Sequence, residues 1–181
     1  MNRRKLTHAP AFKNHPIATD DRTACDMEAL ASIDTLLSTS LKQANYPRLL
    51  LYDIHIPCIR HEVNELFRAA QADFCKNELR QEKAKTRYVG FKDISVPNTI
   101  RVAVVYDSKE IRDSEILHST EQILNRKIGD DYCPAMVEPV GEESIMLDKS
   151  NYNDCYYHAS KIARVEALPA NRQRVLFSSK G

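Results

Sequence analysis

Two residue pairs in this 181-residue chain have the types and spacing of catalytic groups. Asp53 and His55 stand two apart in an apolar run, where a strand would project both side chains to one face. A carboxylate beside an imidazole is typical of a divalent metal site, although a half-buried structural histidine is the interpretation that we favour. Tyr157 and Lys161 stand four apart, as neighbours on a helix do, and would suit a nucleophile with a cationic partner.

The hydrophobic pattern places these residues on an α+β framework. Helical spacing of apolar residues predicts helices over residues 26–42, about 63–79, 116–128 before Gly129, and 150 or 151 to about 168. Strands are predicted over residues 48–56, 87–94 and 99–106, with weaker candidates at 134–139 and 143–147. The short connection after residue 94 predicts an antiparallel hairpin. This order is compatible with a ferredoxin-like antiparallel sheet whose helices pack mainly on one face.

Composition indicates one soluble domain. Residues 1–24 have no apolar period and are expected to form a flexible N-terminal arm, which leaves residues 25–181 as a single domain. No apolar run is long enough for a membrane helix, so we expect a cytoplasmic protein without a membrane partner. The five cysteines are odd in number and form no C-x-x-C pair, which argues against a disulfide framework or a zinc knuckle.

Charge is balanced overall but uneven along the chain. The 26 basic and 25 acidic residues give a formal net charge of +1. Residues 76–92 hold six basic against two acidic residues, and residues 157–181 hold five against one. Residues 107–154, the acidic segment, reverse this with twelve acidic against five basic. If the fold separates these segments, the protein has a positive and a negative side.

Several short blocks carry a resemblance to a known family. Each block is similar to a pattern of that family: residues 46–57 (YPRLLLYDIHIP) to R-apolar-R-x-D-L, 87–93 (RYVGFKD) to R-Y-V-W-V-R-E, 99–106 (TIRVAVVY) to H-Y-H-V-A-L-L-L, 147–150 (LDKS) to L-D-R-N-S, 156–164 (YYHASKIAR) to F-Y-R-x-S-Y-L-A-K and 174–181 (RVLFSSKG) to R-N-F-G-C-S-R-G. Over roughly residues 33–181 the chain resembles replication-initiator-like proteins of prophages and inoviruses, the YagK/YfjJ type. The resemblance implies a single Rep-like α+β domain.

The resemblance also implies a metal held by a His-hydrophobic-His triplet and a helix-borne tyrosine that attacks a phosphate. Thr99 and Arg101 stand at the two histidine positions, and Lys161 stands at the tyrosine position. Asp53 is retained, and Asp93 stands at the place of a family glutamate. We therefore expect no cofactor and no catalytic residue. A substituted metal site, if there were one, would use Asp53, His55 and Asp93.

These substitutions favour a catalytically inactive, initiator-like protein of a mobile element that binds nucleic acid, DNA rather than RNA, without cleaving it. Its candidate phosphate contacts are Arg87, Arg101, Lys161, Arg164, Arg172 and Arg174.

Two alternatives stay open. One is a phage or prophage protein-interaction factor that inhibits a host defence or replication complex through the acidic segment. The other is an active nicking enzyme that uses Tyr157 with Lys161. The sequence does not predict the oligomeric state.

Overall fold

An antiparallel sheet forms the centre of the computed structural model, which describes residues 5–20, 22–56, 86–93, 98–129, 134–141, 143–166 and 174–178. The strands lie in the order β11 (Arg174–Ser178), β6 (Arg87–Asp93), β7 (Thr99–Asp107), β5 (Pro47–His55) and β8 (Met136–Pro139), and β9 (Ile145–Met146) also pairs with β5. All of these pairs are antiparallel. The predicted α+β class, the antiparallel sheet and the β6–β7 hairpin are confirmed, while the ferredoxin-like detail stays a prediction.

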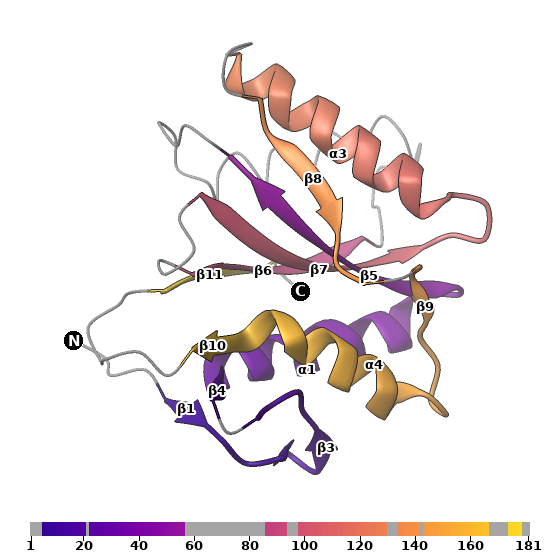
Figure 1. Ribbon diagram of the computed structural model, residues 1–181. Helices are drawn as coiled ribbons and strands as arrows, with labels where there is room; N and C mark the ends of the chain where they lie inside the picture. The colour runs from indigo at the N-terminus through magenta and orange to yellow at the C-terminus, as the bar shows by residue number, and fades with distance from the viewer. Residues whose placement is uncertain are drawn as a thin grey trace.

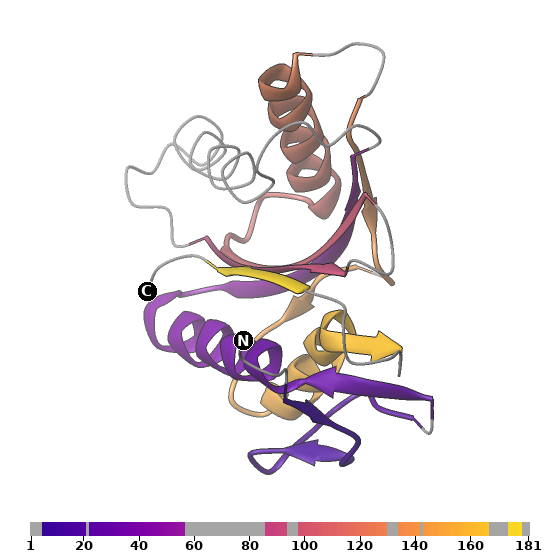
Figure 2. The same cartoon turned by 90° about the vertical axis from the view of Figure 1, so that its left-hand side faces the viewer.

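Helices cover both faces of this sheet. Figure 1 shows α3 (Asp113–Ile128) on one face, with α1 (Met27–Gln43) and α4 (Tyr152–Ser160) on the other, and Figure 2 shows the same layers from a second side. Two of the three described helices thus share one face, but the cover is not confined to it. The reason lies in β5 and β7, which are apolar on both faces and so need cover on both. Among the described residues, no helix is both long and apolar enough to span a membrane.

Alternating side chains of the same strands build two separate cores. The core under α1 and α4 includes Leu49, Leu51, Val89, Phe91, Ala103 and Val105. The core under α3 includes Leu50, Tyr52, Ile54, Val102, Val104 and Tyr106. Because the side-chain period of a strand is two, each strand serves both cores, and its register fixes which residues share a face.

Local signals explain the helix ends. The Asp26 carboxylate caps α1 by accepting hydrogen bonds from the backbone N–H groups of Glu28 and Ala29. Gly129 ends α3 in the left-handed conformation, with φ of 62°, as its place in the sequence predicted. The helix predicted over residues 63–79 lies outside the described residues.

The N-terminal segment differs from the expected flexible arm. It forms β1 (Leu6–Thr7), β2 (Ala11–Phe12), β3 (His15–Pro16) and β4 (Thr23–Asp26), and β4 lies between β1 and β10 (Arg164–Glu166) in a small sheet. Ile17 is 3% exposed and Ala18 5%. The segment lacks a periodic pattern because its strands are short and because it packs against distant residues, as when the Ala18 N–H donates to Ser160 Oγ at 2.8 Å.

Helix α4 ends at Ser160, well before the predicted end at about residue 168. The Ser160 hydroxyl donates to the carbonyl of Tyr157 at 2.7 Å, a local bond that competes with the helical ladder. A single turn of 3-10 helix, η1 (Lys161–Ala163), follows, and the chain then extends as β10 to pair with β4. Pairing with an N-terminal strand that the sequence did not reveal thus shortens the helix.

Side chains of α3 fasten the edge strand β8. Val137 donates its backbone N–H to the Glu121 carboxylate at 2.9 Å. Asn125 bonds both the N–H and the carbonyl of Ala135, just before β8. Pro139, at the end of the strand, has no N–H. One helix therefore both covers a face of the sheet and holds its last strand in place.

Candidate functional site

Strand register gathers polar residues at one end of β5 and β7. Asp53 pairs with Arg101 on β7 and with Glu138 on β8, and His55 pairs with Thr99. Residues opposite one another in an antiparallel pair project to the same face. Asp53 and Arg101 each lie two residues from a residue of the core under α1 and α4, Leu51 and Ala103, and so project to the same face. Five polar residues therefore share this face, namely Asp53, His55, Thr99, Arg101 and Glu138. They are called the Asp53 cluster below.

His55 is held between two neighbours in the Asp53 cluster. Its Nδ1 lies 3.0 Å from Thr99 Oγ1, and its Nε2 lies 3.6 Å from Glu138 Oε2. Thr99 is only 6% exposed, so its hydroxyl gives the ring a fixed partner. Thr99 thus orients the imidazole instead of supplying a metal ligand itself.

Asp53 lacks the partners that His55 has. Its Oδ1 is buried and makes no hydrogen bond, and no ion pair to its carboxylate forms among the described residues. Burial raises the pKa of the Asp53 carboxyl above 3.8, with a further contribution from Glu138, although the charges of Arg101 and His55 oppose the shift. A partly buried carboxylate that the fold leaves unsatisfied is a marker of functional sites.

The structure separates the predicted phosphate-binding cations into two groups. Arg87 donates to the side chain of Gln43, Arg164 bonds Asp20 and Thr23, and Lys161 Nζ lies 3.4 Å from His158 Nδ1. Arg101, in contrast, makes no hydrogen bond or ion pair within the part of the chain that the structure describes.

The side chains of three other predicted site residues, Asp93, Arg172 and Arg174, are not among those that the structure describes. Arg172 lies outside the described residues. Arg174 pairs with Asp93 across β11 and β6, but their side chains are outside the description. The substituted metal set of Asp53, His55 and Asp93 therefore has two members side by side and a third whose side chain is not described. Within the described residues, no group of three His, Cys, Asp or Glu side chains is arranged to hold a metal ion.

The two tyrosines near the predicted nucleophile position have opposite surroundings. Tyr156 is buried, and its hydroxyl donates to the carbonyl of Leu30 at 2.9 Å. Tyr157 is 45% exposed. Lys161, its expected partner, instead approaches His158, whose pKa is lowered by burial and by the Lys161 charge. An exposed Tyr157 is therefore accessible, but the expected pairing with Lys161 is replaced by one with His158.

Sequence reasoning missed Glu138 as a member of the cluster. Glu138 belongs to the acidic segment and to a strand that the sequence predicted only weakly. Its proximity to Asp53 and His55 depends on β8 pairing with β5, a contact between distant parts of the chain. The local signal for an edge strand is weak: Val137 is a single apolar, half-buried residue between the exposed Met136 and Glu138.

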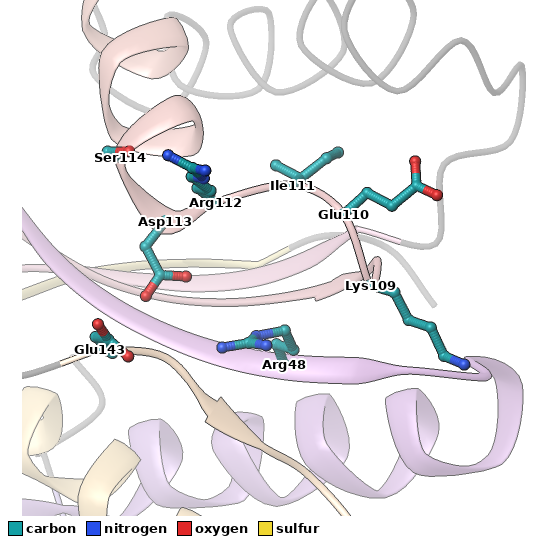
Figure 3. A pocket seen from close by; sticks show the side chains of 8 residues that line it. All are labelled: Arg48, Lys109, Glu110, Ile111, Arg112, Asp113, Ser114 and Glu143. Atoms are coloured by element: carbon teal, nitrogen blue, oxygen red, sulfur yellow. The ribbon is translucent and has the colours of Figure 1, made fainter.

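A second polar region, on the opposite face, lies at the other end of β5. It borders a pocket of about 590 Å³ lined by Arg48, Lys109, Glu110, Ile111, Arg112, Asp113, Ser114 and Glu143. Figure 3 shows Asp113 and Arg48 turned toward the space between the sheet and the start of α3, whereas Glu110 points away. Lys109 lies over the ring of Tyr46, with Nζ 3.7 Å from the ring centroid.

Hydrogen bonds satisfy this second region. Asp113 accepts bonds from the Tyr106 hydroxyl and from the Ser144 N–H, both at 2.6 Å, and Arg48 Nε donates to Ser144 Oγ at 2.9 Å. Burial alone would raise the pKa of Asp113, but these bonds outweigh it and hold that pKa below 3.8. Burial and the bond to Asp113 raise the pKa of Tyr106 to about 12. Arg48, Tyr106, Asp113 and Ser144 are called the Asp113 network below.

Several carboxylates of the acidic segment act within the fold. Asp107 accepts from the N–H groups of Asn45 and Tyr46, and Asp148 accepts from those of Ser150 and Asn151. Asp113 and Glu121 are engaged as described above. This segment is therefore not simply a solvated face, and part of its negative charge stabilises turns and strand ends.

Comparisons of the chain with protein-family models, with curated proteins and with solved structures gave no match.

Proposed function

We propose that this protein binds nucleic acid, DNA in the first instance, without cleaving it, and that Arg101 is its central contact. The observation that carries the proposal is the state of Arg101. It lies in the Asp53 cluster on the sheet face and has no hydrogen bond or ion pair with any described residue. A guanidinium to which no described residue is bonded can bind a phosphate through charge-assisted hydrogen bonds.

The other predicted cations support this contact indirectly. Arg87, Lys161 and Arg164 each have an internal partner, and a phosphate would have to displace it or share the cation. They contribute to the field around the site more than to direct contact. The exposed ring of Tyr157 offers a surface on which an unpaired base can stack.

The absence of cleavage follows from the replaced residues. In the resembling initiators of mobile elements, two imidazoles bind the metal that polarises the phosphate. Here Thr99 and Arg101 stand at those positions, and a guanidinium would repel a divalent cation. Lys161 stands at the tyrosine position. The same replacement that removes the chemistry supplies a cation for the same phosphate.

The test compares two arginines. Affinity for end-labelled single- and double-stranded DNA is measured by fluorescence anisotropy at low and moderate salt, with a chelator present. Arg101→Gln is expected to weaken binding about tenfold and to reduce its salt dependence. Arg164→Gln is the matched control, because it removes the same charge from a residue already bonded to Asp20. Because Arg164 acts at most through the field around the site, this variant should weaken binding clearly less than Arg101→Gln does.

Other outcomes decide against the proposal. No binding at low salt overturns it and directs the search to a protein partner, which is the interaction-factor alternative. Cleavage with Mn²⁺ that disappears in Tyr157→Phe would assign a nicking activity instead. Equal losses in the two arginine variants would show that binding depends on total charge and not on Arg101.

A further inference from the structure

We infer that Asp53 discriminates between bases: it accepts a hydrogen bond from the exocyclic amino group of a base in the bound strand, with cytosine as the test case. The inference rests on the proposed function and adds the chemistry that the site would select. It starts from the contrast between Asp53 and Arg101, which face each other in register across β5 and β7.

Asp53 is an acceptor without a donor. An ionised carboxylate can only accept hydrogen bonds, and leaving its oxygens unpaired in a partly buried place is costly. The described residues supply no such bond to Asp53. The nearest imidazole, His55, is already directed to Thr99 and Glu138. Since no donor to Asp53 is found within the described part of the chain, a bound ligand is the source that we infer for it.

Arg101 supplies the complementary half of the site. Its guanidinium carries five N–H donors and no acceptor, enough to contact a base acceptor as well as the neighbouring phosphate, and no described residue accepts from it. Paired residues of an antiparallel sheet lie about 5 Å apart at their Cβ atoms, so an acceptor and a donor group stand side by side on this face. A ligand that presents a donor next to an acceptor matches both at once.

Cytosine has this arrangement and uracil has its reverse. The amino group at position 4 of cytosine is a donor beside the ring acceptors, and a carboxylate is a known acceptor for it. Uracil is nearly the same shape, but it carries a carbonyl oxygen at that position, so in the pose that cytosine takes two acceptors would meet at Asp53. Uracil could offer its N3–H to Asp53 only by shifting along the site, and the preference for cytosine depends on the cost of that shift.

The carboxylate need not rearrange greatly to act. Oδ1 is buried, yet the residue as a whole is only partly buried. No described residue donates to the second oxygen, Oδ2, either. A base that reaches Oδ2 would give the carboxylate its first hydrogen bond, while Oδ1 stays buried.

The experiment uses the full chain with end-labelled oligo(dC) and oligo(dU) of equal length in a competition titration. These probes have the same backbone and differ at the base edge, so phosphate binding contributes equally to both. Wild type is expected to bind oligo(dC) about five- to tenfold more tightly. Asp53→Asn replaces the pure acceptor by an amide that can also donate, and it should abolish or reverse this preference.

Glu138→Gln is the matched control. Glu138 lies opposite Asp53 in register and loses the same charge, but it is exposed and already contacts His55. If Asp53 only tunes the charge near Arg101, both variants will tighten binding to both oligonucleotides alike. A preference lost in Asp53→Asn and kept in Glu138→Gln supports base discrimination. Circular dichroism and thermal melting verify that the variants are folded.

The outcomes separate the inference from the proposed function. Equal affinity of the wild type for the two oligonucleotides overturns the role of Asp53 and leaves nucleic-acid binding intact. A preference that survives in a folded Asp53→Asn protein also overturns it, because another group must then read the base. Failure to bind either oligonucleotide at low salt overturns both proposals.

Discussion

The Asp113 network and the Asp53 cluster both include residues of β5 and β7, at opposite ends and on opposite faces of the sheet. In the Asp113 network, the carboxylate accepts two short hydrogen bonds, and its pKa is lowered in consequence. In the Asp53 cluster, the carboxylate has an unpaired buried oxygen, and its pKa is raised. The difference teaches that burying a carboxylate is not in itself evidence of function. What matters is whether the fold provides its partners.

The Asp113 network and the Asp53 cluster therefore have opposite effects on the stability of the fold. The Asp113 network ties the start of α3 to β7 and to the segment before β9, so it stabilises the fold. The Asp53 cluster places on the sheet a carboxylate with an unsatisfied buried oxygen, which costs stability, beside an arginine that no described residue bonds. Residues retained at a cost to stability are the ones for which a function has to be sought.

The largest effect is expected from Asp113→Ala. The change leaves the Tyr106 hydroxyl and the Ser144 N–H without their acceptor, and we expect a loss of about 2 to 3 kcal/mol in the free energy of unfolding. Urea denaturation measures it as a lower midpoint. Glu115→Ala is the control, since Glu115 is an exposed carboxylate in the same first turn of α3. Similar losses in both variants would mean that the helix dipole, and not the network, is responsible.

Asp53→Asn should have the opposite sign. Removing a charge that the fold does not satisfy is expected to raise the free energy of unfolding by about 1 kcal/mol at neutral pH. The same denaturation experiment tests it. Glu138→Gln, on an exposed side chain nearby, should change stability far less. A destabilised Asp53→Asn protein would show that Asp53 has a structural partner and would remove the contrast between the two regions.

The stability gain of Asp53→Asn should depend on pH. The pKa of Asp53 is higher in the folded protein than the 3.8 of the unfolded chain. At any pH between the unfolded-state pKa and the folded-state pKa, the folded protein therefore binds more protons than the unfolded chain. Wild-type stability therefore gains from Asp53 as the pH falls through the raised pKa, whereas asparagine does not titrate. The advantage of the variant is present above the raised pKa and is lost on acidification toward 3.8.

Denaturation of both proteins across this pH range measures the effect. The charged groups that act on Asp53, namely Arg101, His55 and Glu138, are unchanged in the comparison. Asp113 should behave in the opposite way, because its contribution is present above 3.8 and is lost as the pH falls through its lowered folded-state pKa. A stability difference that is constant with pH would contradict the assignment of the effect to Asp53.

The smallest effect on stability is expected from Arg101→Gln. Since Arg101 has no described partner, its replacement should change the free energy of unfolding by less than about 0.5 kcal/mol. Arg164→Gln should destabilise the protein more, because Arg164 joins β10 to Asp20 and Thr23. With DNA binding the order should reverse. Thermal melting and anisotropy on the same two variants provide both comparisons.

The sequence predicted the parts of the fold that depend on local patterns. The helix that ends at Gln43, the strand β5 and the antiparallel strands β6 and β7 each appear in the structure close to their expected bounds. Gly129 ends α3 as expected. These features succeed because periodicity and turn chemistry act over a few residues.

The parts that failed depend on distant contacts. The early end of α4 and the packed N-terminal segment both follow from the pairing of β4 with β10, which no periodic pattern reveals. The sequence placed Asp53 and Arg101 on strands but gave no register between them. It also could not show that Arg164 bonds Asp20, or that Arg101 bonds no described residue. Residue type identified the candidate phosphate-binding cations. Which of them lack a described partner could be learned only from the structure.

The fastening of β8 by α3 has a consequence for assembly. On the outer side of this strand, the N–H of Val137 is taken by Glu121 and Pro139 has none to offer, while Asn125 occupies the groups of Ala135. A strand from another chain would find few donors with which to pair. Growth of the sheet by addition at β8, whether in a dimer, a peptide complex or an aggregate, is therefore disfavoured. Helix α3 protects the protein from templating its own association there.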